Sequence, residues 1–199
     1  MIQVCLHGWG SSASRFQAAW DAGTAGDGEA RLFVDGLEPD LASGARRWFP
    51  FSGDPDTLAA SLVRCLPAVE AAIRARLAAA GLAAQQPFEL LGHSQGAMLA
   101  LALALRQRLP IVAVESYAGW LPPAYPAVLA PGAPASMPIA LHSSRADRWV
   151  PPAAVDGSAA RLRALGLRRV EHHISAHLPH TFSSAWLTAA RSDHHATPA

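Results

Sequence analysis

The sequence predicts an α/β fold built on a mostly parallel central sheet with helices on both faces. Short apolar runs alternate with longer helical patterns along the 199 residues, and such alternation is typical of repeated β-α-β units. Right-handed crossovers between parallel strands then place helices on both faces. Hydrophobic residues make up 51% and charged residues 16% of the chain, which is a globular composition sufficient for a buried core.

Six apolar runs have strand length, and we expect strands at residues 2–6, 31–34, 88–91, 111–114, 139–142 and 170–174. Helical patterns occupy residues 57–82, 95–108, 153–165 and 182–191. Pro67 interrupts the first pattern, so we expect a kink or two helices there. Loops are expected at residues 21–28 and 119–138. The prediction is one domain over residues 1–191, followed by a disordered tail at 192–199.

Bulk properties exclude several classes of protein. The formal net charge is +1, so the composition does not indicate electrostatic binding to nucleic acid or anionic lipid. The longest apolar run, residues 97–105, is too short for stable membrane insertion. The first residues lack the pattern of a signal peptide. Cys5 and Cys65 are too few for a disulfide framework, and Cys5 is expected to be a buried free thiol. We therefore expect a cytoplasmic protein.

The strongest chemical signal is GHSQG at residues 92–96. It follows the apolar run FELL and opens the helical pattern AMLALALAL, and this strand, G-x-S-x-G, helix order is the context of a nucleophile elbow. Ser94 would sit on a strained turn at the carboxyl end of a strand, while the glycines let strand and helix approach closely. The helix that follows directs its N–H groups toward developing negative charge. Ser94 is the predicted nucleophile.

A serine hydroxyl needs an adjacent base, and the base in turn needs an orienting acid. Asp147 lies just past a predicted strand and is the expected acid. Pairing of this aspartate with neighbouring arginines in a surface turn is the ordinary alternative. Glu115 lies within a strand run, and Asp156 lies in the first turn of a predicted helix, where a carboxylate stabilises the helix anyway.

The histidine is expected in the loop after the last predicted strand. His172 and His173 fall inside that strand, whereas His177 and His180 lie beyond its end. His180 immediately precedes the final helical pattern, so its ring can lie over the elbow, and it is the predicted general base, with His177 as the alternative. The cluster lacks the spacing of a metal site, so we expect neither a metal nor any other cofactor.

Two backbone N–H groups are expected to form an oxyanion hole. One belongs to Gln95, directly after the nucleophile, and the other to Trp9, in the turn between Gly8 and Gly10. These glycines allow the unusual backbone that turns an N–H inward. We expect His7 to brace this loop rather than to ionise during turnover.

Together these segments resemble the carboxylesterase/phospholipase family of α/β-hydrolases, which includes the acyl-protein thioesterases. The resemblance rests on LHGWGSS, the Arg47-Trp48-Phe49 segment, GHSQGAMLAL, YAGWLP, HSSRADRWVP and the position of His180. Ala97 replaces a usual glycine, and Ser143 follows His142 where the family has glycine. The resemblance implies an α/β-hydrolase fold with minimal or no lid, and hydrolysis of a carboxylic ester or thioester.

The predicted function is therefore that of a serine hydrolase acting through an acyl-enzyme on a small-molecule ester or thioester. Aromatic and apolar side chains on loops are candidates for the acyl pocket: Trp9, Trp48, Phe49, Trp120, Leu121 and Trp149. Two alternatives remain open, because fold does not fix function. One is an acyltransferase or perhydrolase on the same fold, and the other is a non-catalytic binding protein. The oligomeric state does not follow from the sequence.

Overall fold

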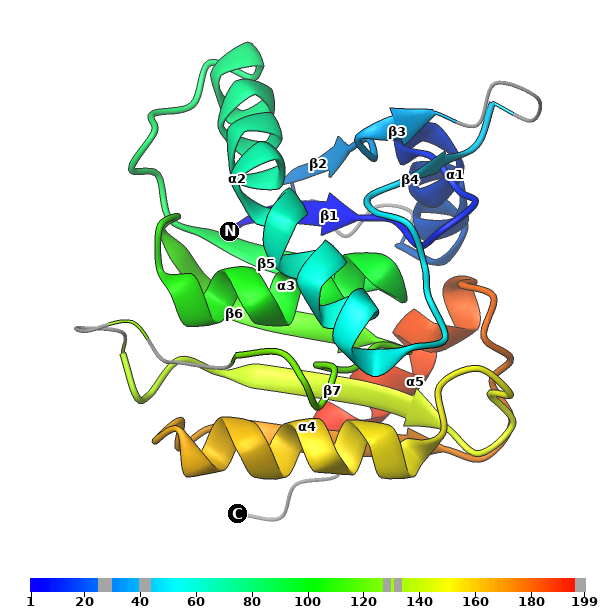
Figure 1. Ribbon diagram of the computed structural model, residues 1–199. Coiled ribbons are helices and arrows are strands. Elements are labelled where there is room, and N and C mark those ends of the chain that lie inside the picture. The colour runs from blue at the N-terminus through cyan, green and yellow to red at the C-terminus, as the bar shows by residue number, and fades with distance from the viewer. Residues whose placement is uncertain (25–29, 40–43, 127–129, 131–133, 196–199) are drawn as a thin grey trace.

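The computed structural model describes residues 1–24, 30–39, 44–126, 130 and 134–195 (Figure 1). Its central sheet has the strand order β2-β1-β5-β6-β7-β8, and every neighbouring pair is parallel. The strands are β1 (Ile2–Leu6), β2 (Ala30–Val34), β5 (Phe88–His93), β6 (Ile111–Tyr117), β7 (Ile139–Ser144) and β8 (Val170–Ser175). The predicted parallel sheet is confirmed. A short antiparallel pair, β3 (Glu38–Pro39) and β4 (Arg46–Arg47), was not predicted.

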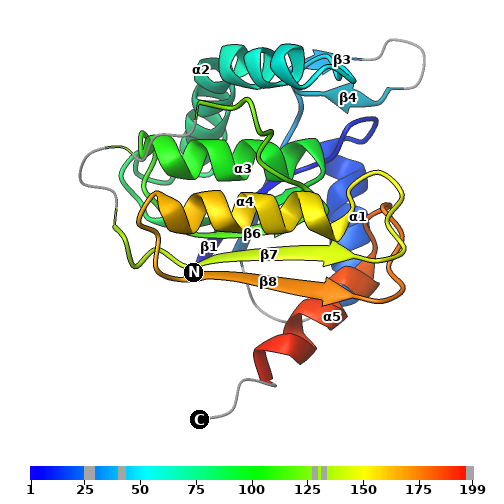
Figure 2. The ribbon, with the colours of Figure 1, turned by 60° about the horizontal axis from the view of Figure 1, so that its bottom comes forward.

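Helices cover both faces of the sheet, as predicted. They are α1 (Ala13–Thr24), α2 (Pro55–Ala79), α3 (Gln95–Arg106), α4 (Pro152–Ala164) and α5 (Ser184–His195). α2, α3 and α4 lie on one face, and α1 and α5 lie on the other (Figures 1 and 2). The last helix extends beyond the expected end at residue 191, and residues 196–199 of the expected tail lie outside the described residues.

Helix α1 corrects the prediction of a loop at residues 21–28. Residues 21–24 belong to the helix, whereas 25–28 lie outside the described residues. Phe16 and Trp20 are one turn apart and are each 3% exposed, because their rings pack edge to face against each other and both contact Phe182, which precedes α5 on the same face of the sheet. This tertiary packing favours a helix despite the glycine and threonine at its end.

Helix α2 is a single helix that contains Pro67. Its first turn is capped by Asp54, whose carboxylate accepts the backbone N–H of Thr57 at 2.8 Å. The ribbon changes direction along the helix (Figure 2), which is the kink that proline favours in a helix interior. The described part of the loop predicted at 119–138 is irregular, as expected, and residues 127–129 and 131–133 lie outside it.

Two hydrophobic cores sandwich the sheet. The larger core joins the sheet to α2, α3 and α4, and the smaller joins it to α1 and α5. The side chains of α3 from Gln95 to Leu105 are all buried, because this helix lies between the sheet and α2. Each fully buried leucine there contributes about 2 kcal/mol through the hydrophobic effect. The central strand β5 and helix α3 are therefore the most firmly held elements around the elbow.

The carboxyl ends of all six strands lie at one edge of the sheet because the strands are parallel. The loops that follow β1, β5, β7 and β8 therefore emerge near each other, and Figure 1 shows the yellow loop after β7 beside the orange loop after β8. Candidate residues far apart in sequence meet at this edge. Among the described residues, no helix combines the length and apolar character needed to cross a bilayer.

Candidate active site

Ser94 occupies a strained turn between β5 and α3. Its backbone has φ 53° and ψ −115°, a left-handed conformation that costs a non-glycine residue about 1–3 kcal/mol. Hydrogen bonds hold the turn: the Ser94 N–H donates to the carbonyl of Tyr117 at 2.9 Å, and the Ser94 carbonyl accepts the N–H groups of Ala97 and Met98 at 3.0 and 3.1 Å. The turn projects the side chain from the edge of the sheet.

The two glycines of the motif are required by close backbone contacts. A Cβ on Gly92 would lie 2.2 Å from the carbonyl oxygen of Gly96, and a Cβ on Gly96 would lie 2.1 Å from the carbonyl oxygen of Leu6. Both distances are far below van der Waals contact. Helix α3 can therefore begin directly over β1 and β5 only when neither position carries a side chain.

Three predicted residues form one hydrogen-bonded chain. His180 Nε2 lies 3.0 Å from Ser94 Oγ, and His180 Nδ1 lies 2.8 Å from Asp147 Oδ2. The Asp147 side chain is fully buried, while that of His180 is 23% exposed. The imidazole therefore bridges a solvent-reachable hydroxyl and a carboxylate that is shielded from water.

The Asp147 carboxylate is held in one orientation by its own loop. Its Oδ1 accepts the backbone N–H groups of Trp149 and Val150 at 2.8 and 3.0 Å. Burial alone raises the pKa of this carboxyl, but the hydrogen bonds from His180, Val150 and Trp149 outweigh it and hold the pKa below its usual value. Asp147 is accordingly an ionised acceptor.

His180 is fixed through its backbone by the elbow and by α5. The carbonyl of His180 accepts a hydrogen bond from His93 Nε2 at 2.7 Å, and the carbonyl of Pro179 accepts one from Trp186 Nε1 at 3.1 Å. Burial, reinforced by the neighbouring His180, lowers the pKa of His93 to about 3, so His93 is neutral and its Nε2 carries the proton. The sequence alone did not indicate this role of His93.

The loop after β1 lies against the elbow. A Cβ on Gly8 would lie 3.2 Å from Ser94 Cβ, and Gly10 has φ +73°. His7 braces this loop as predicted: its Nδ1 donates to the Gly8 carbonyl at 2.7 Å, and its Nε2 accepts the Gly36 N–H at 2.9 Å. Burial lowers the pKa of His7, which keeps the ring neutral.

The buried side chain of Gln95 connects α3 to the 48–49 segment, although only the backbone N–H of Gln95 was predicted from the sequence to have a role. Its Oε1 accepts the backbone N–H of Trp48 at 3.2 Å, and its Nε2 donates to the carbonyl of Phe49 at 2.8 Å. The Trp48 indole N–H donates in turn to the His7 carbonyl at 2.8 Å. The first loop, the 48–49 segment and the start of α3 thus form one network.

A pocket of about 400 Å³ opens beside Ser94. It is lined by Gly8, Trp9, Gly10, Ser11, Arg15, Phe16, Ala19, His93, Ser94, His180, Thr181 and Phe182. Its walls come from the first loop, from α1 and from the segment between β8 and α5. The α1 wall was not predicted because the helix itself was not predicted, although Phe16 and Trp20 at helical spacing indicate it.

The predicted acyl-pocket residues are distributed differently. Trp48, Phe49 and Leu121 are each 1% exposed and belong to the core, and Trp120 packs partly buried against it. Trp149 is 76% exposed. None of these five lines the pocket at Ser94, whereas Trp9 does, with its ring stacked on Phe51 at 6.0 Å between centroids.

The alternative acid and base candidates lie elsewhere. Glu115 accepts a hydrogen bond from the Tyr117 hydroxyl within β6, and His177 is exposed. His172 forms a second chain of the same residue types, with Nε2 at 2.7 Å from Ser143 Oγ and Nδ1 at 2.7 Å from Asp156 Oδ1. Ser143 is only 1% exposed, so this second chain offers no accessible hydroxyl.

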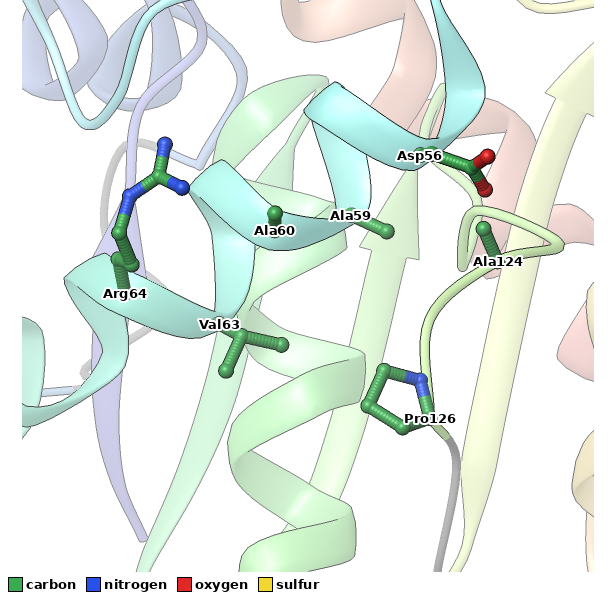
Figure 3. A pocket seen from close by; sticks show the side chains of 7 residues that line it. All are labelled: Asp56, Ala59, Ala60, Val63, Arg64, Ala124 and Pro126. Carbon is green, nitrogen blue, oxygen red and sulfur yellow. The ribbon is translucent and has the colours of Figure 1, made fainter.

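A second pocket, of about 390 Å³, lies along α2 and the segment after β6 (Figure 3). It is lined by Asp56, Ala59, Ala60, Val63, Arg64, Ala124 and Pro126. It shares no lining residue with the pocket at Ser94 and holds no pair of nucleophile and base. In the part of the chain that the structure describes, no cluster of His, Cys, Asp or Glu is arranged to hold a metal ion.

Several solved structures are similar to this protein in fold. The esterase PE8 has a TM-score of 0.76 at 22% identity, over 98% of this chain and 91% of that chain. SOBER1 from Arabidopsis thaliana has a TM-score of 0.74 at 22% identity, over 96% of each chain. Acyl-protein thioesterase 2 from Zea mays has a TM-score of 0.66 at 20% identity, over 94% of this chain and 92% of that one. These likenesses confirm the predicted α/β-hydrolase fold.

Sequence comparison gives the family. No curated protein is similar enough to this chain to count as a match. The profile described as Phospholipase/Carboxylesterase matches residues 2–194, which is nearly the whole chain, and it agrees with the resemblance carried by the first loop and the elbow. The chain therefore belongs to the phospholipase/carboxylesterase family of α/β-hydrolases.

Proposed function

We propose that this chain is a serine hydrolase that cleaves carboxylic esters or thioesters through an acyl-enzyme. The observation that carries the proposal is the hydrogen-bonded chain from Ser94 Oγ through His180 to Asp147, starting on a strained turn at the mouth of a pocket. Membership of a family of esterases and phospholipases supports the reaction class. Neighbours named as an esterase and an acyl-protein thioesterase support testing both kinds of bond.

In the first half-reaction Ser94 Oγ attacks the acyl carbon while His180 Nε2 takes the hydroxyl proton. The 3.0 Å separation of these atoms suits direct proton transfer. Asp147 holds the proton on Nδ1, which leaves the Nε2 lone pair facing Ser94, and its negative charge stabilises the imidazolium that forms. The leaving alcohol or thiol then takes the proton from Nε2.

The tetrahedral oxyanion is held by the backbone N–H groups of Gln95 and Trp9. Gln95 is the first residue of α3, so its N–H points from the positive end of the helix dipole. Gly8, the residue before Trp9, approaches Ser94 closely, and this supports the N–H of Trp9 as the second donor. Loss of one such donor costs about 2.7–4 kcal/mol of transition-state stabilisation.

The second half-reaction hydrolyses the acyl-enzyme. Water enters through the pocket, His180 takes its proton, and the carboxylic acid leaves as Ser94 recovers its hydrogen. Every step uses side chains and backbone groups of this chain, so the proposal needs no cofactor.

We also infer a reducing, cytoplasmic location. Cys5 is fully buried and Cys65 half-buried, and neither is in a disulfide. Burial raises the pKa of the Cys65 thiol to about 12, so it stays protonated and unreactive at neutral pH. Two inert free thiols are ordinary in a reducing compartment.

The test is hydrolysis of short and medium-chain p-nitrophenyl esters and matched thioesters by the wild type and by Ser94→Ala. We expect turnover by the wild type and loss of at least about 10³-fold in Ser94→Ala. A fluorophosphonate probe should label the wild type and not this variant. Ser143→Ala, which changes the buried serine of the second chain, is the matched control and should keep both labelling and turnover.

Two results would contradict the proposal. One is equal hydrolysis by the wild type and Ser94→Ala. The other is a wild type that neither turns over any ester nor takes the probe, which would indicate a binding protein. Thermal unfolding of each variant verifies that it is folded.

A further inference from the structure

The pocket beside Ser94 is lined by aromatic rings. Trp9 comes from the loop after β1, Phe16 from α1, and Phe182 from the segment that leads into α5. The imidazole of His93 forms a further part of the wall. Among the described residues that line the pocket, none is leucine, isoleucine, valine or methionine, and the remaining ones are glycine, alanine or polar. The pocket therefore offers rings, rather than flexible aliphatic side chains, to a bound substrate.

The inner rings are fixed by their own packing. Phe16 is 3% exposed and Phe182 is 9% exposed, and their ring centroids lie 4.7 Å apart with the planes at 72°. The Phe182 ring also lies 5.4 Å from the His93 ring, at 61°. Edge-to-face contacts of this kind are a geometry that aromatic pairs favour. Phe16 further contacts Trp20 and Phe33, so this wall keeps its shape before a ligand arrives.

Trp9 carries the most exposed of these rings. Its ring stacks on Phe51, with the centroids 6.0 Å apart and the planes at 14°, yet Trp9 is still 57% exposed. The turn that carries it is anchored, since the Gly10 N–H donates to the Arg46 carbonyl at 3.0 Å. Phe51 and the backbone thus hold the indole in place, while much of its surface stays open to a ligand.

We propose that the substrate is an ester or thioester that carries an aromatic ring, and that the Trp9 indole binds this ring and sets the preference. This inference rests on the proposed hydrolase function and specifies its substrate class. The substrate ring stacks on Trp9 and meets the rings of Phe16 and Phe182 at the inner wall. The volume of about 400 Å³ lies toward the small end of ligand pockets, which suits one ring and its ester group. A saturated ring fills the same space but has no π-system to stack.

The test compares esters that differ only in whether a ring is aromatic. Ethyl 3-phenylpropanoate beside ethyl 3-cyclohexylpropanoate places the ring on the acyl side, and 2-phenylethyl acetate beside 2-cyclohexylethyl acetate places it on the alcohol side. The cyclohexyl group is the more hydrophobic of the two, so a preference for phenyl does not come from the hydrophobic effect. We expect the wild type to have a kcat/KM about 3- to 10-fold higher for the phenyl ester of at least one pair, measured by titration of the acid released.

Trp9→Leu removes the ring but keeps the backbone N–H. Both esters of a pair use the same oxyanion donors, so the ratio of their kcat/KM values separates the effect of the ring from any effect on catalysis. We expect this ratio to fall to about 1 or below in Trp9→Leu, and Trp9→Phe to restore part of it. Phe51→Leu, which removes the stacking partner of Trp9, should lower the ratio by a smaller factor.

Trp149→Leu is the matched control. It makes the same substitution at a tryptophan that is 76% exposed and does not line the pocket. It should keep the wild-type ratio. Thermal unfolding of each variant verifies that it is folded.

Two outcomes overturn the inference without touching the proposed function. One is a wild type that hydrolyses the cyclohexyl ester equally well or better in both pairs. The other is a preference for phenyl that Trp9→Leu leaves unchanged. Failure of the proposed function looks different, because the wild type would then hydrolyse none of the four esters and take no fluorophosphonate.

Discussion

At the scale of single residues, hydrogen bonding fixes which atoms carry protons at the site. Both oxygens of Asp147 accept hydrogen bonds, Oδ1 from two backbone N–H groups and Oδ2 from His180. His180 must therefore carry its proton on Nδ1 and present an unprotonated Nε2 to Ser94. His93, as a donor to the His180 carbonyl, carries its proton on Nε2. The tautomer of each histidine is therefore set by the group that accepts its hydrogen bond.

Replacing Asp147 with Asn tests this assignment. The amide oxygen can keep the hydrogen bonds from Trp149 and Val150, so we expect nearly wild-type thermal stability. The amide NH₂ would then face His180 Nδ1 and reverse the tautomer, which places a proton on the nitrogen that faces Ser94. We expect kcat to fall by about 10⁴-fold in ester hydrolysis. A loss below 10-fold would show that Asp147 does not set the tautomer.

The three residues of the hydrogen-bonded chain at the site could be predicted from the sequence, whereas the residues that line the pocket could not. Ser94 lies in a motif with a strict backbone requirement, and Asp147 and His180 each follow a predicted strand, so topology alone brings them to one edge. Pocket walls depend on where side chains point from loops, and no periodic pattern records that direction. Trp48 and Phe49 illustrate the point, since they turn inward to the core.

At the scale of secondary structure, the strand starts were predicted more accurately than the strand ends. β6 runs to Tyr117 and β7 to Ser144, beyond the apolar runs that indicated them, because parallel neighbours continue the hydrogen bonding past the last aliphatic residue. The short β3–β4 pair has too few residues for any pattern. The elbow was clear from sequence because strand, turn and helix each left a separate signal.

Two helix glycines give a matched test of the elbow. Gly96→Ala places a methyl group 2.1 Å from the carbonyl oxygen of Leu6, so we expect destabilisation by about 3 kcal/mol or more in urea unfolding. Gly157→Ala lies within α4 and meets no atom within 4 Å, so we expect stabilisation by about 0.5–1 kcal/mol. Equal effects of the two substitutions would contradict the close contact between α3 and β1.

At the scale of the whole molecule, one sheet separates two hydrophobic cores, and the residues of the candidate active site lie at one edge of this sheet. The aromatic residues of the smaller core continue into the pocket, since Phe16 and Phe182 belong to both. The packing of the smaller core and the shape of the pocket are therefore linked on this face. The same edge buries two neutral histidines, His7 and His93, so the folded state as a whole responds to acid.

Folding stability should fall as the pH drops below about 6.5. Burial lowers the pKa of His93 to about 3 and also lowers that of His7, so the unfolded chain binds more protons than the folded chain over this range. The loss from His93 continues down to about pH 3, where its folded-state pKa lies. The lowered pKa of Asp147 adds a further loss below its usual value near pH 4.

Urea unfolding at several pH values measures this slope. His93→Gln retains an N–H donor for the His180 carbonyl and removes the titration, so its profile should be flatter than that of the wild type. His177→Gln changes an exposed histidine and should leave the slope unaltered. Identical profiles for His93→Gln and the wild type would show that the buried ring does not titrate with folding.

The second chain, from Ser143 through His172 to Asp156, serves as a natural control built into the same molecule. It repeats the residue types and the hydrogen-bond order of the first chain, yet its serine lies within strand β7 and is buried out of reach of any reagent. One protein thus holds two copies of an arrangement often taken as a signature of catalysis. In the proposed mechanism, reactivity depends on backbone strain and an open approach, which only Ser94 has of the two serines, so a search for enzymes by side-chain distances alone would count this protein twice.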